Sequence, residues 1–391
     1  MPRLRFLGFI IVAAAFFLLL LSLNERPISV YPKHPQVYTN VIQEEYVTDN
    51  YSYTSTIKDV IKQQRAYIEQ ETSDYPFPYN LKLNNFTLST GGRPLRNIII
   101  TTWRSGSTFL GDIINAIPGN FYHYEPLLNY GIVQIRGPPY GDLAVKNLKN
   151  LLTCNYTDLN NYLDYGQSHV YLFTHNTRLW DMCELHPTYC WDPIFLSEFC
   201  KLFPFQSMKV VRLRLELAEK LLQDKSLNVR ILLLVRDPRG TLQSRKHRNW
   251  CPGVPDCDQP NILCEDMVSD YEAAIRLKSE YPLRFRVIRY EDLSVDPYKH
   301  VQDLFHFFQL HFHPFVKAFL DSHTKLNSGG VSSTFRHSKS VPFHWRTDLN
   351  FSEVQYIEEN CDQAMKLWGY VKAYNESHLR EFNPLTLYSI E

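Results

Sequence analysis

The sequence predicts an α/β protein in which a parallel sheet is flanked by helices and carries a P-loop-like phosphate-binding turn, preceded by one transmembrane helix and a stem. Three observations predict this architecture. An apolar run fills residues 6–23. From residue 93 onward, short β-branched runs alternate with longer helical segments. A Ser/Gly turn joins a strand to a helix at residues 104–108.

The N-terminus has the pattern of a signal anchor. Arg3 and Arg5 precede the uncharged run at 6–23, which is long enough to cross a bilayer. Basic residues in front of such a run favour a cytoplasmic N-terminus. We therefore expect a cytoplasmic tail at 1–5, an uncleaved anchor at 6–23 and a single-pass type II topology with the rest of the chain in the lumen. A cleaved signal peptide is the alternative, but residues 22–25 match a cleavage site poorly.

Charge and cysteine content narrow the class of protein. Lys+Arg and Asp+Glu number 41 each among 391 residues, which argues against a nucleic-acid binder. The 8 cysteines include no C-x-x-C pair, so we expect disulfide bonds and no metal site. Sequons for N-glycosylation agree with a lumenal glycoprotein, and they occur at Asn50, Asn85, Asn155, Asn350 and Asn375.

The chain is expected to divide near residue 93. Residues 24–92 form a lumenal stem, with one amphipathic helix around 57–68 that packs on the body or on a second copy in a homodimer. Residues 93–391 form one α/β domain. Its strands are predicted at 97–102, 120–124, 170–174, 209–213, 230–235 and 286–290. Its helices are predicted at 107–116, 143–152, 215–222, 238–247, 267–279, 300–308 and 352–367.

The most informative segment is the strand–turn–helix at 97–110. Its turn directs backbone N–H groups and a helix N-terminus at one point, which suits a phosphate or sulfate. Gly106 allows close backbone approach, and Arg104 adds a fixed positive charge. A Walker A loop is excluded, because no Lys precedes its Ser/Thr. A serine-capped helix without a ligand is the plain structural alternative.

A second strand–helix junction at 230–245 repeats this arrangement. The strand ends at Arg236, Asp237 and Pro238 start a helix, and Ser244 follows among further basic residues. In a chain of zero net charge, this cluster indicates a dedicated anion site rather than a solvated basic face. Two such junctions predict that one nucleotide is held by two separate phosphate groups.

These motifs resemble those of the Golgi carbohydrate sulfotransferases, specifically the galactose/N-acetylglucosamine/N-acetylgalactosamine 6-O-sulfotransferase family. The R-S-G-S-T-F run at 104–109 resembles that family's 5′-phosphosulfate loop, and R-D-P-R at 236–239 with Ser244 and Arg245 resembles its 3′-phosphate motif. R-Y-E-D-L at 289–293 also matches. The likeness covers about residues 93–370.

The resemblance implies a sulfotransferase fold and a Golgi-membrane enzyme with its catalytic domain at 93–391. It implies transfer of a sulfuryl group from 3′-phosphoadenosine-5′-phosphosulfate (PAPS) to a sugar hydroxyl of a glycan acceptor, with the 6-hydroxyl favoured and no metal required. The donor's 5′-phosphosulfate would be bound by Arg104, Ser105, Gly106, Ser107, Thr108 and Phe109. Arg236 and Ser244 would bind its 3′-phosphate.

A general base is expected in the segment 121–126, where the second strand ends beside the phosphate turn. The resemblance favours Glu125 of the E-P pair as this base. His123 is the alternative, because strand alternation would put both residues on one face. Residues 333–346 are expected to close over the nucleotide, with Trp345 near the adenine and Arg346 near a phosphate. Arg212 either binds an acidic substrate or pairs with a carboxylate.

Two other classes of function share part of this pattern. A Golgi glycosyltransferase would have the same anchor and disulfides, and its metal-binding D-x-D would be sought at Asp256-Cys257-Asp258. However, that triplet lies in a Pro- and Gly-rich loop rather than at a strand end. A non-catalytic lectin-like module would have no use for two Arg/Ser junctions. The acceptor sugar is left open among N-acetylglucosamine, galactose and N-acetylgalactosamine.

Overall fold

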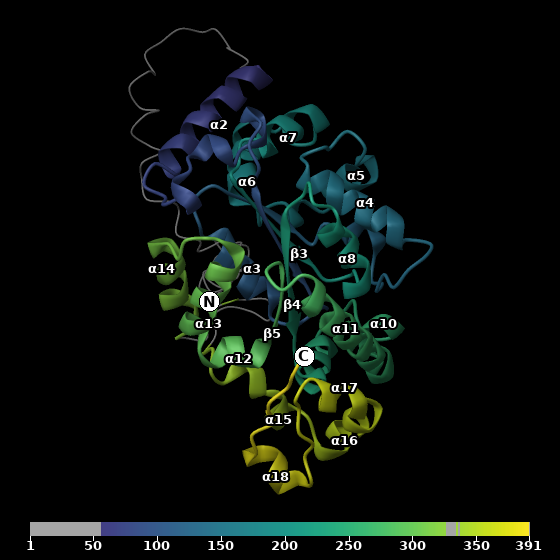
Figure 1. Cartoon of the computed structure of the whole chain (residues 1–391). Coiled ribbons are helices and arrows are strands. Elements are labelled where there is room, and N and C mark those ends of the chain that lie inside the picture. Colours follow the sequence, from purple (N-terminus) through teal and green to yellow (C-terminus); the bar gives the residue numbers. More distant parts are fainter. Residues whose placement is uncertain (1–55, 326–333, 335–336, 391) are drawn as a thin grey trace, which may run out of the picture. The chain divides into compact units, whose positions relative to one another are not determined.

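The computed structural model describes residues 56–325, 334 and 337–390, which belong to one compact unit. Its centre is a five-stranded parallel sheet of order β2-β3-β1-β4-β5 (Figure 1). The strands are β1 (Leu95–Ile100), β2 (Asn120–Tyr124), β3 (Phe205–Val210), β4 (Val229–Val235) and β5 (Phe285–Arg289). The predicted parallel sheet flanked by helices is therefore confirmed.

Helices connect the strands and continue to the C-terminus. The α-helices up to β4 are α2 (Ile57–Glu71), α3 (Ser107–Asn115), α4 (Gly141–Leu152), α5 (Asn160–Ser168), α6 (Thr177–Leu185), α7 (Pro193–Cys200) and α8 (Leu215–Gln223). After β4 they are α9 (Pro238–Lys246), α10 (Pro255–Asp258), α11 (Pro260–Glu280), α12 (Tyr290–Val295), α13 (Pro297–Phe308), α14 (Pro314–His323), α15 (Trp345–Asp348), α16 (Phe351–Asn360), α17 (Asp362–Leu367) and α18 (Glu376–Glu381). Short 3₁₀ turns are η1 (Pro78–Asn80), η2 (Leu83–Asn85), η3 (Leu88–Thr90), η4 (Leu128–Tyr130), η5 (Val170–Leu172) and η6 (Val341–Phe343).

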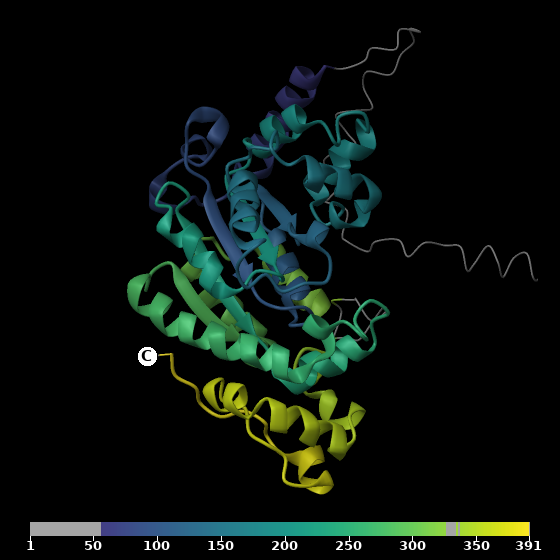
Figure 2. The same ribbon diagram turned by 90° about the vertical axis from the view of Figure 1, so that its right-hand side faces the viewer.

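Every residue of β1 and β4 is buried, because helices cover both faces of the sheet (Figures 1 and 2). Alternation along β1 sends Ile99 into one core with α3, α13 and α14, and Ile98 and Ile100 into the other with α4, α8 and α11. The two cores fix the sheet rigidly between its helical layers. The carboxyl ends of all strands therefore meet along one edge.

Residues 56–92, which we placed in the stem, pack into this unit. Thr56 forms a capping box with Asp59 at the start of α2, and Val60 and Ile68 on its inner face are buried. The end of α2 is held by an ion pair between Glu71 and Arg178 of α6. Within the described part of the chain, no helix is both long and apolar enough to cross a bilayer. The predicted anchor at 6–23 lies outside the described residues.

Three predicted elements differ in the structure. Residues 170–174 do not form a strand. They form η5 instead, because Phe173 packs its ring on Tyr162 and Trp191 within a helical layer. The strand expected at 209–213 begins and ends earlier in the sequence, as β3 (Phe205–Val210). The single helix expected at 352–367 is broken at Cys361, which caps α16 and is disulfide-bonded to α11.

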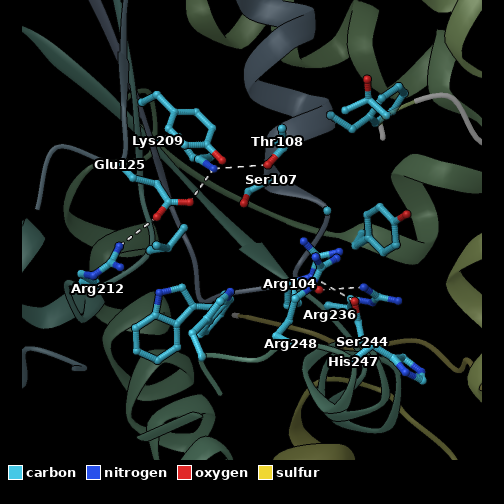
Figure 3. Close-up of a pocket in the computed structure, with 18 of the residues that line it drawn as sticks. Arg104, Ser107, Thr108, Glu125, Lys209, Arg212, Arg236, Ser244, His247 and Arg248 are labelled. Atoms are coloured by element: carbon cyan, nitrogen blue, oxygen red, sulfur yellow. Dashed lines mark hydrogen bonds and ion pairs between the residues drawn. The ribbon is translucent and has the colours of Figure 1, made fainter. Parts of the chain in front are cut away.

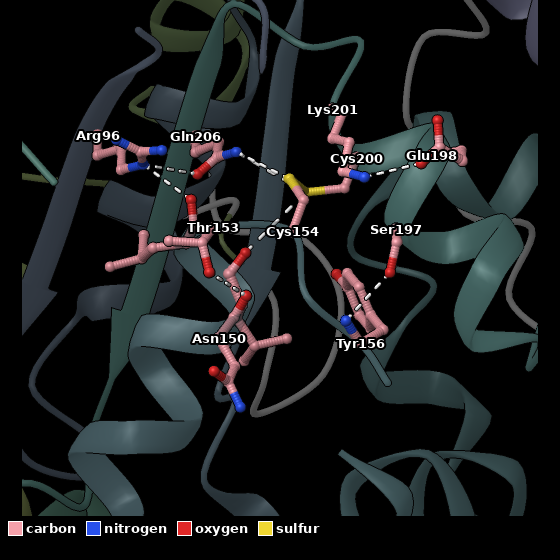
Figure 4. Close-up of a disulfide and its surroundings, with 12 residues drawn as sticks. Arg96, Asn150, Thr153, Cys154, Tyr156, Ser197, Glu198, Cys200, Lys201 and Gln206 are labelled. Carbon is pink, nitrogen blue, oxygen red and sulfur yellow. Dashed lines mark hydrogen bonds and ion pairs between the residues drawn. A yellow bond between two sulfur atoms is a disulfide. The ribbon is translucent and has the colours of Figure 1, made fainter. Parts of the chain in front are cut away.

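All eight cysteines are paired, so the expected disulfide bonds are present. The pairs are Cys154–Cys200, Cys183–Cys190, Cys251–Cys257 and Cys264–Cys361. The first joins the ends of α4 and α7 beside Gln206 of β3, whose amide donates a hydrogen bond to Cys154 Sγ at 3.2 Å (Figure 4). The last ties α11 to the C-terminal helices across 97 residues of sequence.

Replacing both Cys264 and Cys361 with Ser is expected to destabilise the protein more than replacing both Cys183 and Cys190. The reason is loop length, since the two disulfides span 97 and 7 residues respectively. Loop-closure entropy predicts a difference of about 2 kcal/mol in the free energy of unfolding. Denaturant unfolding of the two double variants measures it, and equal losses would contradict the chain-entropy account.

Candidate active site

A cavity of about 570 Å³ opens at the carboxyl edge of the sheet. Each strand delivers a lining residue directly or a few positions after it ends: Arg104 after β1, Glu125 after β2, Arg212 after β3, Arg236 after β4 and Tyr290 after β5. β1 lies between β3 and β4, so the direction of the strand order reverses beside it. Open α/β sheets bind their ligands at such a point.

The predicted phosphate turn forms one wall of this cavity. Arg104 and Gly106 adopt the left-handed conformation, with φ of 65° and 84°. Gly106 is the N-cap of α3, and no side chain caps the helix there. The first N–H groups of α3 are therefore available to an anion. Ser107, Thr108 and Phe109 also line the cavity, whereas Ser105 is fully buried behind the turn.

The second basic segment lies directly against this turn (Figure 3). The Arg104 Nε donates a hydrogen bond to Ser244 Oγ at 3.0 Å, and Arg236 Nη1 donates one to the Arg104 carbonyl at 2.6 Å. The Arg236 guanidinium also lies over the ring of Tyr290, 4.8 Å from its centroid. Its buried Nε has no hydrogen-bond partner. The two predicted anion-binding segments thus form one continuous site.

The positive charges at this end of the cavity repel one another. Burial, together with Arg248 and Arg236, lowers the pKa of Arg104 to about 10. The guanidinium remains protonated at neutral pH, but its charge is destabilised by its neighbours. A bound anion would reverse this repulsion. The geometry therefore favours a ligand with more than one negative group near Arg104, Arg236 and Arg248.

The other basic residues of the second motif have structural partners. Arg239 is fully buried and pairs with Asp237 and Glu358. The guanidinium of Arg245 donates hydrogen bonds to the carbonyls of Trp103 and Cys257. These contacts brace α9 against the phosphate turn and against the C-terminal helices. Within residues 236–245, Arg236, Gln243 and Ser244 line the cavity.

Glu125 lies at the centre of a buried ion-pair cluster. Its Oε1 is 2.9 Å from Lys209 Nζ, and its Oε2 is 2.9 Å from Arg212 Nη1 (Figure 3). Burial alone would raise the pKa of Glu125, but Lys209 and Arg212 outweigh it and lower the pKa to about 2. Its backbone is left-handed, with φ of 44°, and this turns the side chain into the cavity at the end of β2.

His123, the alternative base, does not line the cavity. The left-handed turn at Glu125 breaks the strand alternation on which that alternative depended. The His123 imidazole is buried against the ring of Phe121 in the core, 5.0 Å between centroids. Burial lowers its pKa to about 3, so it is neutral there.

Lys209 is a site residue that our sequence reasoning missed. It is fully buried in β3, and its Nζ lies 3.3 Å from Thr108 Oγ1 and 3.7 Å from the centroid of Tyr124. Lys209 therefore connects the phosphate turn with Glu125. The signal for it was a lone Lys inside the apolar strand F-Q-S-M-K-V, since a buried ammonium needs a specific partner. Arg212 pairs with a carboxylate, which was one of its two predicted roles.

Two further expectations are corrected by the geometry. Trp345 does not line the cavity, because its indole is buried over the guanidinium of Arg239 at 4.1 Å. Arg346 donates instead to the Phe382 carbonyl. Other residues of the same region do line the cavity, namely Thr334, Ser338, Val341 and His344.

Asp256 and Cys257 of the Asp256–Asp258 triplet make contacts that hold the surrounding loop in place. Asp256 accepts hydrogen bonds from the Gln134 N–H and from Arg136, and Cys257 is disulfide-bonded. In the described ranges, no cluster of three or more His, Cys, Asp or Glu side chains could hold a metal ion. The D-x-D hypothesis for a glycosyltransferase is therefore not supported at this triplet.

One family model and several curated proteins match this chain. The family model described as "Sulfotransferase domain" matches residues 95–369. The chain is 26% identical to mouse carbohydrate sulfotransferase 5 over 75% of this chain and 85% of that protein. It is 27% identical to human carbohydrate sulfotransferase 6, over 72% and 82% respectively.

Solved structures similar to this chain also carry sulfotransferase domains. One is the sulfotransferase domain of the Synechococcus PCC 7002 olefin synthase, with a TM-score of 0.36, 15% identity and coverage of 68% of this chain and 94% of that one. Another is sulfotransferase STF9 of Mycobacterium avium, with a TM-score of 0.34, 14% identity and coverage of 80% and 97%.

Replacing Gly106 with Ala is expected to weaken anion binding at the turn. A Cβ there would lie 2.2 Å from a ring carbon of Tyr290, in addition to the strain of a left-handed alanine. Gly91→Ala is the matched control, because Gly91 also has positive φ but open space around it. We expect about a tenfold or greater loss of affinity for inorganic pyrophosphate in Gly106→Ala alone, measured by calorimetric titration. Equal affinities in the two variants would contradict this assignment.

Glu125→Gln is expected to destabilise the protein in a pH-dependent way. The folded-state pKa of about 2 lies below the ordinary 4.5, so the stabilisation by Glu125 is present above about pH 4.5 and is lost as the pH falls toward 2. The variant leaves Lys209 and Arg212 buried without their carboxylate, at a cost of about 3 kcal/mol at pH 7.

Urea unfolding at pH 7 and pH 3 measures this difference. The gap between wild type and Glu125→Gln should narrow at the lower pH. Glu353→Gln serves as a control, since Glu353 pairs with the exposed Lys246 at the surface and should change stability little at either pH. A gap that does not depend on pH would contradict the ion-pair assignment.

Proposed function

The chain belongs to the sulfotransferase family, and on that premise we propose that it transfers a sulfuryl group from PAPS to a hydroxyl of a glycan. One observation carries the proposal. Two strand-to-helix junctions, each with Arg and Ser, are hydrogen-bonded to each other across one wall of a single cavity through Arg104, Ser244 and Arg236. Such a pair of junctions fits a nucleotide that carries phosphate at both its 5′ and 3′ positions.

The residues at this wall fit the donor. The N-terminus of α3, with Arg104, Ser107 and Thr108, would hold the 5′-phosphosulfate. Arg236 and Ser244 would hold the 3′-phosphate, and the unpartnered Arg236 Nε supports an acceptor atom there. The charge repulsion that lowers the pKa of Arg104 would be relieved by these anionic groups.

The donor supplies an activated sulfuryl group. In the transfer, a bond forms between the sugar oxygen and sulfur, and the bond from sulfur to the bridging phosphate oxygen breaks. Adenosine 3′,5′-bisphosphate (PAP) is the leaving group. The protein must then take the hydroxyl proton and stabilise charge on the leaving phosphate. We assign the proton to Glu125 and the stabilisation to Arg104 and the N–H groups of α3. His123 is not retained for this role, because it lies in the core.

Lys209 links these two tasks. While paired with Lys209 and Arg212, Glu125 is a poor base, because its pKa is about 2. The Lys209 ammonium also lies within 3.3 Å of Thr108 Oγ1 at the phosphate turn, so an anion bound at the turn competes with Glu125 for it. Movement of Lys209 toward that anion would remove one cation from Glu125 and raise its pKa. The base would thus become competent when the donor is bound.

The relatives and the covalent structure support a proposal for the acceptor and for the compartment. The relatives are named carbohydrate sulfotransferases, which supports a sugar hydroxyl as acceptor. We favour the 6-hydroxyl of N-acetylglucosamine, galactose or N-acetylgalactosamine on glycoproteins or proteoglycans. Complete pairing of the cysteines supports an oxidising compartment, and together with the predicted anchor it is the basis on which we propose the Golgi membrane, with the catalytic domain in the lumen.

Arg104→Ala and Ser244→Ala are expected to lower the transfer of labelled sulfate from PAPS to a glycan panel by about 100-fold each, because each removes a charged or hydrogen-bonding group that contacts the donor. Lys246→Ala is the control, since Lys246 lies on the same helix, is exposed and pairs with Glu353. Transfer should persist in a metal chelator. Absence of transfer by the wild type, or an equal loss in Lys246→Ala, would contradict the proposal.

A further inference from the structure

Part of the cavity lining consists of aromatic side chains from the segment around the end of α5. Tyr165 and His169 of the α5 region and Tyr171 of η5 face it, and we call these three residues the aromatic wall. The rings of Tyr165 and His169 stack face to face, with centroids 3.9 Å apart and planes 1° from parallel. Tyr171 lies edge-on to His169 at 6.4 Å and is 58% exposed.

The aromatic wall lies beside the proposed base. The helix α5 packs against η4, the turn that directly follows Glu125, and Leu128 of that turn also lines the cavity. The pKa of Tyr171 is raised by burial and then by the charges of Tyr165 and Glu125, which places its phenol within electrostatic reach of the carboxylate. A molecule stacked on the wall therefore has Glu125 at its edge.

The charges around this wall indicate a neutral ligand. Lys209 and Arg212 are the basic residues next to Glu125, and both pair with it. The Arg212 Nε also donates to the Gly131 carbonyl at 2.6 Å. Arg212 is close enough to Tyr171 to lower the pKa of its phenol, but its guanidinium already pairs with Glu125. An acidic sugar would thus compete with Glu125 for that cation, whereas the flat rings offer apolar faces and phenol groups to a neutral one.

We infer that the aromatic wall is the acceptor subsite, where Tyr171 stacks on the apolar C–H face of a neutral pyranose whose hydroxyl points at Glu125. This inference rests on the proposed sulfuryl transfer and names its acceptor class as neutral sugars rather than uronates. Aromatic rings suit this task because they present a large rigid face at low conformational cost and, in tyrosine, a hydrogen-bonding group. Tyr171 is therefore a specificity-determining residue of the site.

Steady-state kinetics of four proteins test the inference: wild type, Tyr171→Ala, Tyr171→Phe and Tyr356→Ala. Tyr356 is the matched control, because it is 55% exposed on α16 and does not line the cavity. We expect the KM for an N-acetyllactosamine oligosaccharide to rise about tenfold in Tyr171→Ala and to stay near the wild-type value in Tyr171→Phe and Tyr356→Ala. The affinity for PAP should be the same in all four.

Three results would overturn the inference. The first is an unchanged KM in Tyr171→Ala, and the second is an equal loss in Tyr171→Phe, which would show that the ring face is not what binds. The third is transfer of sulfate by the wild type to the uronate residue of a chondroitin oligosaccharide, because the inference excludes a charged pyranose from the stacked position. Failure of the proposed function is distinguishable, since the wild type would then transfer sulfate to neither acceptor or would not bind PAP.

Discussion

The contact between the two predicted phosphate-binding segments is the interaction on which the site depends. The Arg104 side chain donates to Ser244, and the Arg104 carbonyl accepts from Arg236, so the turn after β1 and the helix after β4 hold each other in place. Neighbouring parallel strands bring these segments together at one edge of the sheet. The left-handed backbone of Arg104 allows its carbonyl and its guanidinium to serve both contacts.

Buried charge in this protein has two separate uses. Arg239 and Arg245 are saturated by carboxylates, carbonyls and aromatic rings, and they join α9 to the rest of the fold. Arg104 and Arg236 face the cavity, where like charges act on Arg104. A bound anion would offset this repulsion between like charges. The Lys209–Glu125–Arg212 cluster combines both uses. Its charges are paired with one another, but an anion bound at the turn would compete with Glu125 for Lys209.

Sequence reasoning located the sheet and the two strand-to-helix junctions that line the cavity, because strong apolar runs, Gly106 and the Asp237-Pro238 helix start are local signals. It did not find Lys209, whose role comes from the parallel pairing of β2 with β3 and appears only when Tyr124 and Lys209 are neighbours. It also read residues 170–174 as a strand, since a short apolar run cannot by itself distinguish a strand from a packed turn. That segment forms η5 instead, which contributes Tyr171 to the aromatic wall. Residue pattern alone could not decide between His123 and Glu125 as the base. The left-handed backbone at Glu125 breaks the strand alternation, but no glycine marks that position in the sequence.

The central claim is that one nucleotide spans both segments, with its 3′-phosphate at Arg236 and Ser244. Calorimetric titration of the purified protein with PAP and with adenosine 5′-monophosphate tests it most directly, since the two ligands differ only in that phosphate. Two charge-assisted hydrogen bonds predict that PAP binds about 100-fold more tightly, and Ser244→Ala should reduce the difference. Equal affinities of the wild type for the two nucleotides would contradict the account.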